Sequence, residues 1–174
     1  MTAQAEVLVD EGLPDGFAEY VGARGAALQR FAHLVTGGAA DSADLVQDAL
    51  ERAYPRWRGL VRRGTHDAYV RRSIVNGSVS RWRKQRRLVS VGDIEPYDAA
   101  VAAAPAVLDA AEAWQLCGEL PPAQRAAVIL RFHEDLSFAE IARILDCAEA
   151  TARSHVHRAL ATLRTRLAVG DDDD

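Results

Sequence analysis

Between Leu136 and Leu167, apolar residues recur at helical spacing in two runs separated by a short break. The first run starts after Ser137, and Glu140 follows three residues later, the pattern of a capping box that satisfies the free amides at a helix start. The apolar stripes are Phe138, Ile141, Ala142 and Leu145 in the first run and Ala152, Val156, Ala159, Leu160, Leu163 and Leu167 in the second. The pattern predicts two helices joined by a tight turn at residues 146–148.

The outer face of the second predicted helix is polar and partly basic. Its first turns carry hydroxyl, guanidinium and imidazole groups on Thr151, Arg153, Ser154, His155 and Arg158. Such groups suit the edges of bases in the major groove of DNA, where a recognition helix is inserted. The alternative is a bundle helix whose polar face is simply exposed to water.

Helical periodicity also dominates an earlier block, and no run of alternating β-branched residues favours a strand. Helices are expected at residues 17–35, from 41–42 up to Pro55, and at 67–87, with a loop at 57–65. The fold class is therefore all-α, with two small helical domains at 15–88 and 113–169. Between them, residues 89–112 have the composition of a flexible acidic linker. Residues 1–14 and the acidic tail 170–174 are expected to be disordered.

Acidic and amide side chains line one face of the second expected helix. Asp44, Gln47, Asp48 and Glu51 are spaced i, i+3, i+4 and i+7, so they lie on one side of it. The helix dipole favours acids near an N-terminus, which accounts for Asp44 but not for Glu51. The face therefore also suits docking of a basic helix from a partner protein.

Charge is strongly segregated along the chain, although its net value is only −4. Residues 52–87 carry eleven arginines and one lysine against a single aspartate, a net charge of +11, whereas residues 1–51 carry −7 and residues 88–114 carry −5. This segregation indicates a polyanionic partner for the basic segment. The basic residues expected on the outside of the long helix are Arg71, Arg72, Arg81, Arg83, Lys84, Arg86 and Arg87.

Aromatic side chains are interleaved with these arginines. Cations for phosphates and rings for unstacked bases are what binding of a single strand requires, which makes Trp57 and Tyr69 candidates for such contacts. Packing in the core is the alternative for Tyr69 and the favoured interpretation of Trp82. Asn76-Gly77 disfavours a helix locally, and a conflict of this kind often marks a functional position.

No catalytic, metal or cofactor site is expected, because the five histidines are scattered and the two cysteines form no paired motif. No apolar run approaches the roughly 20 residues of a membrane span, and a reducing cytoplasm fits the chain best. An enzyme acting on nucleic acid is one alternative, but it lacks a catalytic constellation. A regulator that joins the same hairpin to a receiver domain is another, but residues 1–112 lack the hydrophobic strands of such a domain.

Taken in order, three segments resemble those of a sigma factor of the extracytoplasmic-function (ECF) group of the sigma-70 family. DSADLVQDALERAY at 41–54 is similar to the region 2 helix that grips the β′ clamp helices of RNA polymerase. AYVRRSIVNGSVSRWRKQRR at 68–87 resembles the helix that recognises and opens the −10 element. LPPAQRAAVILRFHEDLSFAEIARILDCAEATARSHVHRALATLR at 120–164 resembles region 4, which reads the −35 element. The resemblance covers the whole chain except the termini and the linker.

The resemblance implies a transcription initiation factor, not an enzyme, that binds core RNA polymerase at the β′ clamp helices and the β flap and directs it to promoter DNA. An anti-sigma factor is a further partner that the family commonly has. The implied polymerase contacts are Asp44, Leu45, Gln47, Asp48 and Glu51; the −10 contacts are Trp57, Arg62, Arg63, Tyr69, Arg72, Asn76, Arg81 and Lys84; and the −35 contacts are Thr151, Arg153, Ser154, His155 and Arg158.

The chain departs from the family pattern at four positions of the hairpin: Asp146, His155, and Ala148 and Ala150, which replace commoner turn residues. Asp146 stands at the turn where the family usually has glycine, but aspartate tolerates the left-handed conformation better than most residues, so the turn is expected to survive. His155 stands where arginine or lysine is frequent, so base preference there is expected to differ and to depend on the histidine charge. Region 3 is expected to be absent, because residues 88–112 are too polar and irregular to form it.

Overall fold

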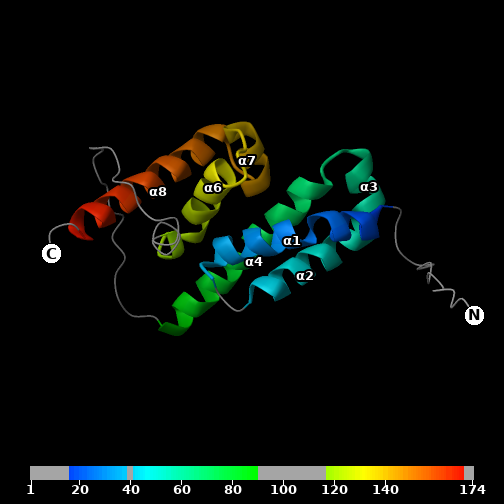
Figure 1. Ribbon diagram of the computed structural model, residues 1–174, viewed down its shortest axis with the longest axis horizontal. Coiled ribbons are helices and arrows are strands. Elements are labelled where there is room, and N and C mark those ends of the chain that lie inside the picture. Colours follow the sequence, from blue (N-terminus) through cyan, green and yellow to red (C-terminus); the bar gives the residue numbers. More distant parts are fainter. Residues whose placement is uncertain (1–15, 39–40, 90–116, 171–174) are drawn as a thin grey trace, which may run out of the picture.

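The structure, a computed structural model, describes residues 16–38, 41–89 and 117–170. Its helices are α1 (Phe17–Thr36), α2 (Ser42–Ala53), the 3-10 helix η1 (Tyr54–Arg56), α3 (Trp57–Arg62), α4 (His66–Val89), α6 (Pro122–Phe132), α7 (Phe138–Leu145) and α8 (Glu149–Gly170). Figure 1 shows a first bundle of α1 to α4 and a second bundle of α6 to α8 lying against it. The all-α class is confirmed. The disordered termini predicted for 1–14 and 170–174 and the linker predicted for 89–112 lie outside the described residues, except that Val89 ends α4 and Gly170 ends α8.

The first bundle forms because α1, α2 and α4 each bury one apolar stripe. Phe31, Val46 and Ile74, one from each helix, are all at most 3 % exposed. The helices predicted for 17–35 and 41–42 onward are confirmed within one residue at their starts. Gly37, at a φ of +74°, ends α1, since its left-handed conformation suits a residue without a side chain.

Helix α4 continues through Asn76-Gly77 without a break, and packing explains the unfavourable glycine. A Cβ atom at Gly77 would lie 2.5 Å from Cδ2 of Leu45, so glycine lets α2 approach α4 closely. Leu45 itself is only 2 % exposed. The local conflict seen in the sequence thus reflects close helix packing at Gly77, whereas the side chain of Asn76 is exposed.

The loop predicted for residues 57–65 is wrong over its first six residues, which form α3. Trp57 is 1 % exposed, and its ring meets Phe17 edge-on with 4.9 Å between ring centroids. Tyr20 and His66 lie against the same ring, at 4.9 and 5.3 Å. Burial of this large aromatic ring stabilises a short helix that its glycine and arginine content does not suggest.

The second bundle confirms the predicted hairpin. The Ser137 hydroxyl accepts a hydrogen bond from the Glu140 amide while the Glu140 carboxylate accepts one from the Ser137 amide, which completes the capping box. Asp146 ends α7 at a φ of +55°, so the turn survives without glycine. Ala152 and Val156 bury the inner face of α8, and both are at most 3 % exposed.

The two bundles share one continuous cluster of buried apolar residues. At one end of their contact, the buried guanidinium of Arg125 donates to the carbonyl of Val35 at the end of α1 (3.0 Å) and to the carbonyls of Cys117, Gly118 and Leu120. A Cβ atom at Gly37 would lie 3.2 Å from Cα of Gly118, so the backbones approach closely here. Four carbonyl acceptors satisfy a buried cation that would otherwise be costly.

Candidate nucleic-acid and polymerase interfaces

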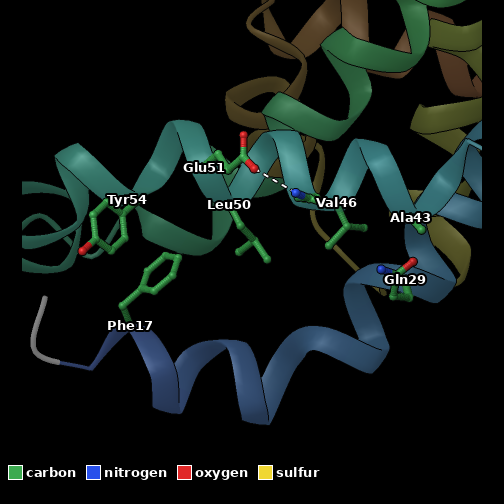
Figure 2. A pocket seen from close by; sticks show the side chains of 8 residues that line it. Phe17, Gln29, Ala43, Val46, Leu50, Glu51 and Tyr54 are labelled. Atoms are coloured by element: carbon green, nitrogen blue, oxygen red, sulfur yellow. Dashed lines mark hydrogen bonds between the residues drawn. The ribbon is translucent and has the colours of Figure 1, made fainter. Parts of the chain in front are cut away.

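The acidic face of α2 borders an apolar groove between α1 and α2. The groove has a volume of about 470 Å³ and is lined by Phe17, Gln29, Ala43, Val46, Gln47, Leu50, Glu51 and Tyr54. Figure 2 shows Phe17 and Leu50 pointing into the space between the two helices. Glu51 stands on the rim, where its Oε1 accepts a hydrogen bond from Gln47 Nε2 at 2.9 Å. An apolar floor with an acidic rim suits a partner helix that presents apolar residues flanked by basic ones.

The predicted polymerase contacts divide into surface and core residues. Asp44, Gln47 and Glu51 are exposed, and Asp48 is half-buried, with an oxygen 3.5 Å from Nη2 of Arg81. For Leu45 the helical period predicts the buried stripe of α2, whereas the resemblance implies a polymerase contact; the structure places its side chain beneath α4 in the core, so the contact is wrong and the stripe is right. Its apolar character follows the helical stripe that holds α2 to α4, not a docking surface.

The predicted −10 contacts show the same division. Arg62 and Arg63 are exposed at the end of α3, and Asn76 and Lys84 are exposed on α4. The prediction for Trp57 is wrong, because its buried ring belongs to the aromatic cluster and cannot receive a base. The described turn that remains open beside α3 runs from Arg63 to Thr65.

Three further residues of the −10 set are partly covered. Tyr69 is half-buried and packs against the shared apolar cluster. Arg81 lies 3.5 Å from carboxylate oxygens of both Asp41 and Asp48 on the α2 side. Arg72 forms an ion pair with Asp146, which belongs to the second bundle. Two arginines expected to hold phosphates are therefore already paired with carboxylates of the same chain.

Arg71 was predicted on the outer face of α4, and this is wrong, since it is only 5 % exposed. Its Nε donates to Asp67 at 2.8 Å, and its Nη1 pairs with Glu134, between α6 and α7. Asp67 also accepts a hydrogen bond from the Tyr20 hydroxyl at 2.9 Å. The i, i+4 spacing of Asp67 and Arg71 could have suggested a pair. The Glu134 partner, 63 positions away, leaves no sign in the local pattern.

The pKa values of Tyr20 and Asp67 are shifted in opposite directions, that of Tyr20 upward and that of Asp67 downward. Burial raises the pKa of Tyr20, and the neighbouring Asp67 carboxylate raises it further. Burial alone would also raise the pKa of Asp67, but the Arg71 guanidinium and the Tyr20 hydrogen bond outweigh it and hold that pKa below its usual range. Asp67 is thus an anion and Tyr20 a neutral donor at physiological pH.

The predicted −35 contacts lie together on the front of α8, its outward face between Thr151 and Arg158. Thr151, Arg153, Ser154 and Arg158 are exposed, and His155 is half-buried. The Arg153 guanidinium lies 4.5 Å from the ring centroid of Phe138, and its Nη2 is 3.1 Å from a carboxylate oxygen of Glu149. Stacking on the ring restricts the side chain near the front of the helix, which lowers the entropy lost when it binds.

His155 does not extend this set of cations at neutral pH. Burial lowers its pKa, and the nearby Arg158 charge lowers it further. The ring is therefore neutral at physiological pH and offers one donor and one acceptor. Across the described ranges, no three metal-binding side chains lie together, and no helix is long and apolar enough to cross a membrane.

The chain thus carries, in order, the polar face of α2, the long basic helix α4 and the helix-turn-helix of α7 and α8. The comparisons with known proteins then give the family. The family description "Sigma-70 region 2" matches residues 21–88, and "Sigma-70, region 4" matches residues 111–163.

Sigma factors from other bacteria are similar in sequence to this chain over nearly its full length. The chain is 38 % identical over 158 residues to the RNA polymerase sigma-E factor of Streptomyces avermitilis, covering 90 % of this chain and 88 % of that protein. It is 37 % identical over 172 residues to the sigma-E factor of Streptomyces antibioticus, covering 98 % and 91 %. Identity to the ECF sigma factor SigW of Bacillus subtilis is 23 % over 173 residues, covering 91 % and 92 %.

A solved structure supports the same assignment. The sigma factor RpoE in its complex with the anti-sigma factor NepR from Bartonella quintana matches with a TM-score of 0.68 and 27 % identity, covering 90 % of this chain and 99 % of that chain. The chain belongs to the ECF group of the sigma-70 family. It is a transcription initiation factor that directs RNA polymerase.

Proposed function

We propose that the chain holds a promoter at two points, with the α3–α4 surface at the −10 element and the front of α8 at the −35 element. The observation that carries this is the exposed polar front of α8, fixed to its bundle by buried alanine and valine. Bidentate arginine contacts to base edges are each worth about 1–3 kcal/mol of discrimination. Arg153 and Arg158 would each discriminate one base position of the −35 element in this way.

At the −10 element, the proposed contacts are Arg62, Arg63, Tyr69, Arg72, Asn76, Arg81 and Lys84. Opening a duplex requires unstacking, which costs a few kcal/mol per base, so the protein must bind the extruded bases and the separated strand. The turn after α3 is exposed from Arg63 to Thr65, and the exposed cations beside it offer ligands for phosphates. Trp57 acts behind this surface by fixing α3 in place.

The proposed docking site for core RNA polymerase is the groove between α1 and α2, whose lining includes Gln47 and Glu51, together with Asp44 and Asp48 on the same helix. Its occupant would be the β′ clamp helices, with the β flap contacting the second bundle. We further propose that residues 15–88 and 113–169 are the functional domains, that an anti-sigma factor restrains them, and that the protein acts in the cytoplasm without catalysis of its own.

Run-off transcription with core RNA polymerase tests the proposal as a whole. Purified core enzyme with this chain is expected to give a transcript from a genomic promoter fragment, and scrambling either the −10 or the −35 element should remove it. Polymerase without the chain is the control. A transcript that ignores both elements would contradict the two-point assignment.

A charge reversal separates docking from DNA binding. Glu51→Arg places a cation on the rim of the groove and is expected to weaken association with core polymerase at least tenfold, because it opposes a basic partner helix. Glu19→Arg is the matched control, since this exposed acid of α1 does not line the groove. Equal affinity of both variants for core enzyme, measured by fluorescence anisotropy, would show that the rim is only solvated surface.

A further inference from the structure

The two bundles meet across the first half of α4, the helix assigned to the −10 element. Helix α4 contacts both α6 and α7. The pairs that cross this contact, Arg71 with Glu134 and Arg72 with Asp146, both use arginines of α4 and carboxylates of the second bundle. Figure 1 shows α7 beside the upper part of α4. A carboxylate is an anion that binds a guanidinium as a phosphate does.

The two ion pairs differ in environment. Arg71 is buried and Glu134 is mostly covered, with side chains 6 % and 13 % exposed, and Arg71 also pairs within its own helix. Arg72 and Asp146 are open to water, at 40 % and 66 %. Partners that remain in contact with water exchange easily. The outer pair is therefore the one that a DNA phosphate can displace.

The backbone does not require a carboxylate at Asp146. Its φ of +55° and its amide hydrogen bond to the carbonyl of Ala142 are the features of a left-handed helix end, which glycine or asparagine supplies equally well. What the aspartate adds is a negative charge within reach of Arg72. Asp135, at a φ of +53° before α7, has the same backbone type and is exposed, but forms no ion pair among the described residues.

We propose that Asp146 is an internal competitor for DNA: its carboxylate occupies the Arg72 guanidinium, so that −10 DNA must displace this carboxylate before a phosphate can bind Arg72. The Arg125 clamp between Val35 and residues 117–120 keeps the far end of the contact in place. This inference rests on the proposed role of Arg72 at the −10 element. It gives the free factor a restraint that lies within its own chain.

The test is the affinity of the full chain, without polymerase, for a single-stranded −10 oligonucleotide at low salt. Asp146→Asn keeps the left-handed turn and removes the charge, and we expect about two- to fivefold tighter binding, the range for loss of an exposed ion pair. Asp146→Gly should behave in the same way. Asp135→Asn changes the net charge equally and is expected to bind as the unaltered chain does.

The outcomes separate the inference from the function on which it rests. If Asp146→Asn binds no tighter than Asp135→Asn, the competitor role is overturned. Arg72→Ala is then measured in the holoenzyme on a promoter with an intact −10 element, where reduced opening is expected. Unchanged opening in that variant would overturn the assignment of Arg72 itself, and the competitor role with it.

Discussion

Helices α4 and α8 are both proposed to bind DNA, but their basic side chains are placed differently in the fold. On α8, Arg153 and Arg158 are exposed, and the partner of Arg153 is a neighbour on its own helix. On α4, Arg71 is buried, and Arg72 is bound to a carboxylate of the other bundle. A basic residue on such a helix can therefore either form ion pairs inside the fold or remain free to bind nucleic acid, and the exposed fraction of its side chain distinguishes the two roles.

The difference matches the task proposed for each helix. Reading a duplex requires only that the front of α8 enters an intact groove, so it can be permanently open. Binding separated strands is useful only after polymerase has docked, so the proposed occupation of Arg72 by Asp146 would limit contacts made too early. The shielding reaches only part of α4, since Asn76 and Lys84 remain exposed.

The sharpest test of the comparison is the removal of the buried arginine. Arg71→Met is expected to lower the free energy of unfolding by about 3–5 kcal/mol, because it leaves Asp67 and Glu134 without their shared cation. Urea denaturation followed by circular dichroism measures it. Arg153→Met, on the open helix, should cost less than about 1 kcal/mol. Similar losses in both variants would remove the distinction between core and DNA-binding arginines.

Local patterns predicted the parts of the structure that local forces determine. The capping box at Ser137, the apolar stripe of α8 and the starts of α1 and α2 all depend on residues within a few turns of one another. The exposed acids of α2 and the polar front of α8 followed from the same periodicity. The sequence could therefore predict most of the helices and most of the exposed candidate site.

Long-range packing determined what was missed. Helix α3 exists because Trp57 is buried against residues of α1 and α4, and periodicity gives no sign of those partners. Arg71 and Arg72 are adjacent in the sequence and both pair with carboxylates of the other bundle, yet only Arg71 is buried, and nothing in the local pattern reveals those partners. Leu45 fitted both a docking face and a core stripe, and only the approach of α4 at Gly77 decides between them.

A smaller effect, on promoter binding, is expected from removing an exposed arginine of α8. Arg153→Ala should weaken binding of the holoenzyme to a promoter by about 1–3 kcal/mol, the value of one good contact to a base edge. Strand opening at −10, followed by permanganate reactivity, should be unchanged once the complex has formed. Arg143→Ala is the control, because this exposed arginine of α7 lies outside the front of α8. If Arg153→Ala lost as much binding affinity on a promoter with a scrambled −35 element as on the intact promoter, the assignment of Arg153 to that element would be contradicted.

The smallest effect expected concerns His155. Burial first and the Arg158 charge second lower its pKa, which favours the neutral ring, so protonation requires a pH below the usual value near 6.5. A neutral ring neutralises no phosphate, and each phosphate neutralised adds about 0.9 to the salt slope of duplex binding. The binding of duplex DNA by His155→Gln and by the unaltered chain should therefore depend on salt with equal slopes at both pH 8 and pH 7.

His157→Gln is the control, because it removes the exposed histidine on the same helix. A slope that is larger by about one in the unaltered chain at pH 7 would mean that the ring is charged on DNA, and the cations of α8 would then include a histidine as well as arginines.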